Sequence, residues 1–153
     1  MNIGIIIHSQ TGNTLSVAEK LRAALALKGH NAKIERVAAE GEKPQEKDIK
    51  LISIPDCEKY DALIFGAPVW AFSLSPVMRE FLKLVPALGD KKVCCFVTQH
   101  FGKPWLGGNR SVRQMSKMCS QKGASISGTG VINWSSKEKE NQIAQLTARF
   151  SEI

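Results

Sequence analysis

The stretch Ile3–Thr14, which reads IGIIIHSQTGNT, determines how the rest of the chain is expected to fold. It opens with an apolar, β-branched run that is typical of a strand buried on both faces. From Leu15 onward, apolar residues recur at spacings of three and four, which predicts an amphipathic helix. The chain therefore runs from a strand, through a tight polar loop, into a helix.

The polar loop has the composition of an anion-binding site. Its backbone N–H groups, from Gln10 to Thr14, and the positive end of the helix dipole point toward one spot. The hydroxyls of Ser9, Thr11 and Thr14 can donate to phosphate oxygens from the same side. An ordinary helix cap needs only one hydroxyl. Three hydroxyls around Gly12 therefore favour phosphate binding.

Two widespread phosphate loops do not match this segment. A Walker loop, G-x-x-x-x-G-K-[ST], requires a Lys, and a dinucleotide fingerprint, G-x-G-x-x-G, requires more than the single Gly12. What remains is a loop that binds a phosphate monoester with hydroxyls and backbone groups. The segment Ser9-Gln10-Thr11-Gly12-Asn13-Thr14 resembles the FMN-phosphate loop of the flavodoxin family. The aromatic residue that this family usually has two residues before the Ser is Ile7 here.

Length and composition indicate an ordinary globular protein. We expect one domain over residues 1–153, with 43% apolar and 23% charged residues. The short apolar run at the N-terminus has no basic segment before it, and no stretch reaches the length of a membrane span, so we expect a cytoplasmic protein. The four cysteines have neither C-x-x-C nor metal-ligand spacing, which predicts reduced, buried thiols and no metal.

The net charge of +7 is unevenly distributed along the chain. Residues 1–90 carry eleven basic and eleven acidic side chains, whereas residues 91–137 carry eight basic and no acidic ones. No nucleic-acid-binding module accompanies these cations, so a nucleic acid is not expected as a partner. They either cover a solvated face or meet an acidic or phosphate-bearing partner.

Four further segments have the character of strands, and they lie at residues 32–37, 62–66, 93–97 and 126–134. Helices are expected after the last three, at residues 76–84, from 109 to about 121, and from 135 or 136 onward. We expect Pro68 to end the third strand, Asn109 to cap the third helix, and Leu84 to face inward.

Continuously apolar strands that alternate with helices predict a parallel sheet covered on both faces. With a phosphate loop after the first strand, the fold class is α/β: a doubly wound, five-stranded parallel sheet of order 2-1-3-4-5. Phospho-receiver domains share this order, but their acidic residues are replaced here by His8-Ser9 and by Gly66-Ala67-Pro68. No insertion interrupts the fifth strand, so the chain is similar to short-chain flavodoxins.

In this topology, a ligand binds outside the carboxyl ends of strands one, three and four. A flavin ring needs planar apolar walls, which Trp70 and Phe72 can supply, and polar groups at its rim, which the peptides of 68–71 can supply. The resemblance to flavodoxins implies that Trp70 lines the ring, although a Trp packed in the core is the alternative. The candidates in this loop are Pro68, Val69, Trp70, Ala71 and Phe72.

The loop after the fourth strand is long, aromatic and rich in glycine, as a third wall of the ring site would be. Trp105 in this loop can stack, form a lid or anchor the loop. The residues that are candidates by position are Thr98, Gln99, His100, Phe101 and Gly102.

Two departures from the family bear on the flavin chemistry. Flavodoxins often have Gly after the ring-side aromatic, where a peptide flips as the flavin takes up one electron. The corresponding residue here is Ala71, for which a positive φ costs about 1 kcal/mol of conformational free energy. Flavodoxins are also typically acidic near the flavin, whereas Lys103, Arg110 and Arg113 make this side basic. A basic side favours the anionic reduced flavin and raises its potential.

The resemblance implies an FMN protein that carries electrons between partner proteins, with no catalytic residue of its own. The expected partner is an acidic redox protein near Lys103, Arg110 and Arg113. The alternative is an NAD(P)H-dependent FMN reductase of quinones or similar acceptors, in which Arg110 and Arg113 pair with a nucleotide phosphate. A third possibility is a flavin-free binding domain.

Overall fold

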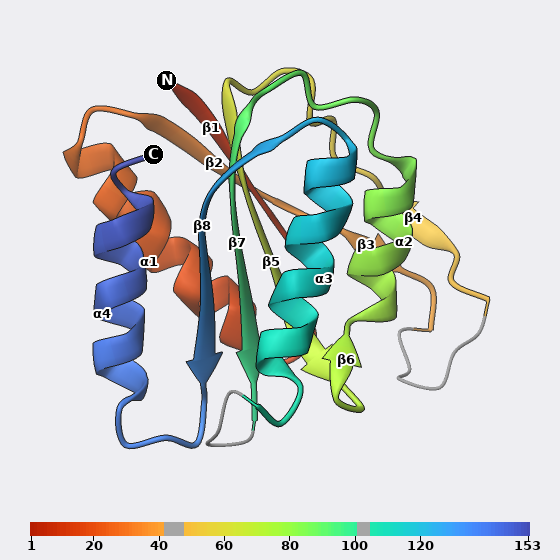
Figure 1. Ribbon diagram of the computed structural model, residues 1–153, viewed down its shortest axis with the longest axis vertical. Helices are drawn as coiled ribbons and strands as arrows, with labels where there is room; N and C mark the ends of the chain where they lie inside the picture. The colour runs from red at the N-terminus through yellow and green to blue at the C-terminus, as the bar shows by residue number, and fades with distance from the viewer. Residues whose placement is uncertain (42–47, 101–104) are drawn as a thin grey trace.

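The computed structural model describes residues 1–41, 48–100 and 105–153. Five parallel strands form the main sheet, in the order β2-β1-β5-β7-β8 (Figure 1). Numbered along the chain, these long strands have the order 2-1-3-4-5, so the predicted topology is confirmed. Their bounds are β1 Asn2–Ile7, β2 Asn31–Arg36, β5 Ala62–Trp70, β7 Lys92–Gln99 and β8 Ser125–Asn133.

Helices cover both faces of the sheet. Figure 1 shows α1 (Asn13–Leu27) and α4 (Lys139–Phe150) together on one side, and α2 (Pro76–Leu84) and α3 (Gly108–Gln121) on the other. Two apolar cores result, one under each helix pair. Alternate residues of β7 enter opposite cores, so Cys94 packs with α1 and α4 while Cys95 packs with α2 and α3.

Three short strands lie outside the parallel ladder. β3 (Ala38–Ala39) and β4 (Leu51–Ser53) form a separate antiparallel pair. β6 (Ser73–Leu74) pairs antiparallel with the end of β5, Val69 opposite Leu74 and Trp70 opposite Ser73.

Pro68 does not end the third strand, because β5 continues to Trp70. Pro68 is in register with Thr98 of β7, and its carbonyl oxygen accepts a hydrogen bond from the Ser75 N–H, 3.1 Å away. The N–H and C=O of one strand residue point to the same side. The N–H that a proline lacks would have pointed toward β6, not toward β7. The hydrogen bonds between β5 and β7 are therefore not interrupted at Pro68.

Three other local expectations are wrong. Helix α3 is preceded by Gly107 rather than capped by Asn109, and its start has no side-chain cap. Helix α4 begins at Lys139, three or four residues later than expected. Leu84 is 61% exposed, because α2 ends there and Leu82 faces the core instead.

Gly66 of β5 packs directly against the Phe96 ring of β7. A Cβ atom at this position would lie 2.3 Å from the Phe96 ring. We expect Gly66→Ala to lower the free energy of unfolding by about 1–3 kcal/mol, the usual cost of overpacking a core. Urea denaturation measures this change. Adding Phe96→Leu should recover part of the loss, and a Gly66→Ala variant as stable as the parent would contradict the prediction.

Candidate functional site

The polar loop after β1 leads into a helix whose start has no side-chain cap. Gly12 precedes α1 with φ of 97°, and its carbonyl oxygen accepts the Ser16 N–H at 2.9 Å. The Ser9 hydroxyl accepts the Leu15 N–H at 3.2 Å, so it supports the first turn from outside. The side chains of Gln10 and Thr11 are exposed. The loop thus brings the positive end of a helix and exposed polar side chains to one place, as an anion site requires.

Thr14 ties this loop to the end of β7. Its side chain is buried, and its Oγ1 lies 2.9 Å from Thr98 Oγ1. The two hydroxyls belong to the first and the last of the three expected loops. Thr14 therefore fixes the spacing between the loop that enters α1 and the loop that leaves β7.

An open cleft of about 210 Å³ lies where the three loops meet. Its walls come from the ends of β5 and β7 and from the start of α1, as the topology predicts. Ser9, Gln10, Gly12 and Thr14 belong to the same loop as two of the lining residues but do not line the cleft themselves. The lining residues are Thr11, Asn13, Pro68, Val69, Trp70, Thr98, Gln99 and His100.

Trp70 is the last residue of the central strand β5, and its side chain is only partly buried. It therefore does not belong to the core. The fully buried ring of His8 meets it edge to face, with ring centres 5.1 Å apart and planes at 74°. His8 Nδ1 lies 2.7 Å from the Ser75 Oγ, and that oxygen accepts the Met78 N–H that opens α2. The orientation of Trp70 is thus set by a chain of contacts that runs into α2.

The turn after Trp70 is strained. Ala71 and Phe72 have φ of 50° and 64°, and together they connect β5 to β6. A left-handed backbone conformation costs about 1–2 kcal/mol of conformational free energy for each residue other than glycine. The positive φ expected at Ala71 is therefore observed, and Phe72 adds a second cost of the same kind. Gly107 packs against this turn so closely that a Cβ atom there would lie 2.8 Å from Phe72 Cα.

The rest of the loop after β7 is described only in part. His100 lines the cleft and is exposed, whereas Phe101, Gly102 and Lys103 lie outside the described residues. Trp105 is 69% exposed, and its role as a stacking residue, a lid or an anchor of the loop stays a prediction. Arg110 and Arg113 are exposed on the first turns of α3.

Three residues near the cleft were not recognised in the sequence. Arg36, at the end of β2, donates from Nη2 to the Ser9 carbonyl oxygen and adds a positive charge beside the polar loop. His8 and Ser75 orient Trp70. The sequence contained one indication of the role of His8, which is a histidine directly after an otherwise apolar strand.

Three of the four thiols lie in surroundings that raise their pKa and so disfavour the reactive thiolate. All four cysteines are free and buried. Burial raises the pKa of Cys57 and of Cys94 to about 12 each. A hydrogen bond with Cys119, and burial, raise the pKa of Cys95 as well. Within the described residues, no group of three or more His, Cys, Asp or Glu side chains is placed to hold a metal ion.

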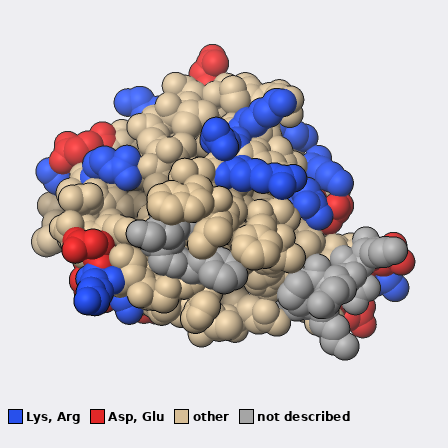
Figure 2. All heavy atoms as spheres, turned by 60° about the horizontal axis from the view of Figure 1, so that its bottom comes forward, with Lys and Arg blue, Asp and Glu red and all other residues tan. Residues whose placement is uncertain are grey.

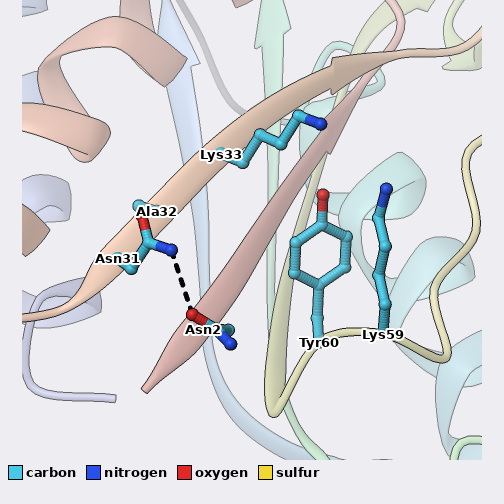
Figure 3. A pocket seen from close by; sticks show the side chains of 6 residues that line it. All are labelled: Asn2, Asn31, Ala32, Lys33, Lys59 and Tyr60. Atoms are coloured by element: carbon cyan, nitrogen blue, oxygen red, sulfur yellow. Dashed lines mark hydrogen bonds between the residues drawn. The ribbon is translucent and has the colours of Figure 1, made fainter.

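A second hollow, of about 360 Å³, lies at the opposite end of β1 and β2 (Figure 3). Its polar groups largely satisfy one another: Asn31 Nδ2 donates to Asn2 Oδ1 at 3.0 Å, and the Tyr60 hydroxyl donates to Glu35. Burial and the Glu35 carboxylate raise the pKa of Tyr60, which keeps it a neutral phenol. This hollow has none of the strand ends at which such sheets bind ligands.

A family model described as flavodoxin matches residues 5–145. The chain belongs to the flavodoxin family.

A search of curated proteins found no significant match. No helix in residues 1–41, 48–100 and 105–153 is long and apolar enough to cross a membrane.

Several solved flavodoxins have the same fold. Oxidised flavodoxin 1 from Bacillus cereus is 18% identical, with a TM-score of 0.70 over 99% of this chain and 98% of that one. Two-electron reduced Megasphaera elsdenii flavodoxin is 19% identical, with a TM-score of 0.72 over 99% of each chain. A flavodoxin, WrbA-like protein from Agrobacterium tumefaciens is 17% identical, with a TM-score of 0.71 over 99% and 95%. At these identities the likeness shows the fold.

Membership of the flavodoxin family implies a flavin cofactor, and the cleft fits one. The start of α1 after Gly12 suits a phosphate, and Thr11 and Asn13 line the same cleft as Trp70. Thr98 and Gln99, at the end of the neighbouring strand β7, also line the cleft. A site with one planar apolar wall and a few polar groups is what a flat heteroaromatic ring requires.

Proposed function

We propose that this protein binds FMN and carries electrons between partner proteins as a single domain over residues 1–153. The observation that supports this proposal most strongly is the shared cleft, in which Thr11 and Asn13 of the anion loop lie together with Trp70. A mononucleotide needs both parts at one site: a phosphate cradle and a flat wall for the ring. Buried, free cysteines accord with a reducing, cytoplasmic environment.

The proposed binding residues form three groups around the cofactor. The phosphate group comprises Ser9, Gln10, Thr11, Gly12, Asn13 and Thr14. The ring wall on the β5 side comprises Pro68, Val69, Trp70, Ala71 and Phe72. The third wall comprises Thr98, Gln99 and His100, together with Phe101 and Gly102, which lie outside the described residues.

FMN supplies the electron-transfer chemistry, and the chain supplies position and electrostatics. Thr11 and the first backbone N–H groups of α1 hold the phosphate. Trp70, held edge to face by His8, would provide an apolar wall for the ring and exclude water from that side. The charge of Arg36, beside Ser9, favours an anionic group in the loop.

Substitution of Thr11 tests the phosphate group. Because a hydrogen bond to a charged group contributes about 1.5–3 kcal/mol, Thr11→Val should weaken FMN binding about tenfold or more. Quenching of FMN fluorescence on titration with protein measures the affinity. Thr147→Val on α4, where the hydroxyl donates to Ala144 O, is the matched control and should leave affinity unchanged. Equal affinities for the Thr11 variant and the parent would remove the proposed site.

A second function, an NAD(P)H-dependent reductase of quinones or similar acceptors, is favoured by Arg110 and Arg113, which are exposed on α3 and suited to a nucleotide phosphate. NADPH consumption in the presence of benzoquinone distinguishes it from the carrier, which should show no turnover. A third reading, a flavin-free binding domain, predicts a colourless protein that does not bind added FMN. For the carrier, we place the acidic redox partner near Lys103, Arg110 and Arg113; Lys103 lies outside the described residues.

A further inference from the structure

Helix α3 carries a row of cations along its exposed side. Arg110, Arg113 and Lys117 are all exposed. At about 100° per residue, their spacing places them within about 60° of one another around the helix. At about 1.5 Å per residue, the row is about 10 Å long. The three side chains therefore form one continuous positive strip.

This strip has little acidic charge around it. Helix α3 contains no Asp or Glu. The ion pairs found among residues 1–41, 48–100 and 105–153 do not include its three cations. The neighbouring α2, which packs against α3, adds Arg79 and adds Lys83, which is paired with Glu80. Figure 2 shows Lys and Arg side chains gathered over this part of the surface, with Asp and Glu toward the margins.

Exposed aromatic side chains lie at the end of α3 that borders the cleft. Phe72 is 53% exposed and Trp105 is 69% exposed. Gly107, two residues after Trp105, touches the Phe72 backbone, so both aromatics lie beside the start of the cationic strip. Protein interfaces combine an aromatic centre with a polar, charged rim. The cationic strip and these two exposed aromatic side chains, beside the candidate flavin cleft, together have the composition of a docking surface.

We propose that Phe72, Trp105 and the strip Arg110, Arg113 and Lys117 form the docking surface for an acidic redox protein, an inference that rests on the proposed carrier function. The occupant has carboxylates around an apolar contact and meets the aromatics next to the flavin cleft. With FMN bound, this contact would let one electron pass per encounter from the partner's one-electron metal centre to the cofactor, so that the partner would be oxidised by one electron. A nucleotide phosphate would need only one or two of these cations, whereas the strip presents three in a row.

A plant-type ferredoxin, which is acidic and has a one-electron iron–sulfur centre, is a suitable probe. Stopped-flow mixing of dithionite-reduced ferredoxin with the FMN-loaded protein gives the association rate. Because complementary charge accelerates encounter, Arg113→Glu combined with Lys117→Glu should slow association by about tenfold or more at about 0.02 M ionic strength. The difference should vanish at about 0.5 M, where charges are screened.

The control is Arg22→Glu combined with Lys33→Glu, which changes the net charge equally on α1 and β2. This control should change the rate by less than about twofold, because its charges lie away from α3. Trp105→Ala should speed dissociation and leave the salt dependence unchanged. Equal slowing in both double variants, no slowing in either, or equally fast association with basic cytochrome c would overturn the proposal. So would weaker NADPH binding in the α3 variant without any effect on ferredoxin.

The proposed function and the docking surface fail separately. FMN titration of each variant reports whether the flavin site exists and is intact. Calorimetric binding of ferredoxin to the flavin-free chain reports the surface alone. A chain that binds no FMN but binds ferredoxin through α3 would retain the surface and lose the carrier function. A chain that binds FMN but does not bind ferredoxin would keep the proposed flavin site and lose the proposed docking surface.

Discussion

Trp70→Ala is expected to weaken FMN binding by about 100-fold, because stacking on an aromatic ring contributes about 1–3 kcal/mol and the apolar wall is removed as well. Fluorescence titration measures the affinity. The effect should be large because Trp70 is fixed before the ligand arrives: His8 holds it edge to face at 5.1 Å. A preorganised wall spends little binding energy on ordering.

Trp70→Phe is the matched variant, since it keeps a planar ring at the same place and should retain most of the affinity. Circular dichroism of each variant establishes that the fold is intact. If the Ala variant bound FMN as tightly as the parent, Trp70 would not contact the ring. The flavin would then have to lie elsewhere in the cleft.

Gly107→Ala is the substitution from which we expect the largest loss of stability. It places a side chain at φ of 109° and, at the same time, a Cβ atom 2.8 Å from the Phe72 backbone. We expect the free energy of unfolding to fall by about 2–4 kcal/mol, because backbone strain and overpacking add. FMN affinity should fall too, since the turn that follows Trp70 is displaced. Urea denaturation and FMN titration measure the two effects.

Gly29→Ala separates strain from collision. Gly29 has φ of 84°, but a Cβ atom there would meet nothing within 4 Å. It should therefore cost only about 1 kcal/mol, the strain alone, and leave FMN affinity unchanged. Equal losses for the two variants would show that contact between Gly107 and Phe72 contributes nothing.

The sheet could be predicted from the sequence because its signals are local. Each long strand is an apolar or alternating run, and the helices repeat apolar residues every three or four positions. Strand order then follows from the parallel, doubly wound arrangement. The polar loop was equally visible, because its strand, hydroxyls and helix are consecutive in the chain.

Contacts between distant segments were not visible. His8 meets Ser75 across 67 positions, and Arg36 meets Ser9 across 27. The extension of β5 beyond Pro68 depends on β6, whose two residues have no periodicity of their own. A turn with Ala71 and Phe72 in the left-handed region contradicts local preference, which favours Gly or Asn there. Such a turn is held in place by packing against a distant glycine.

The arrangement of the cleft also bears on how such proteins diverge. Each of its three walls leaves a different parallel strand and returns through a separate crossover helix. One wall can therefore change its charge or shape during evolution while the register of the other strands is kept. Flavodoxins that share fewer than one residue in five with this chain have the same frame.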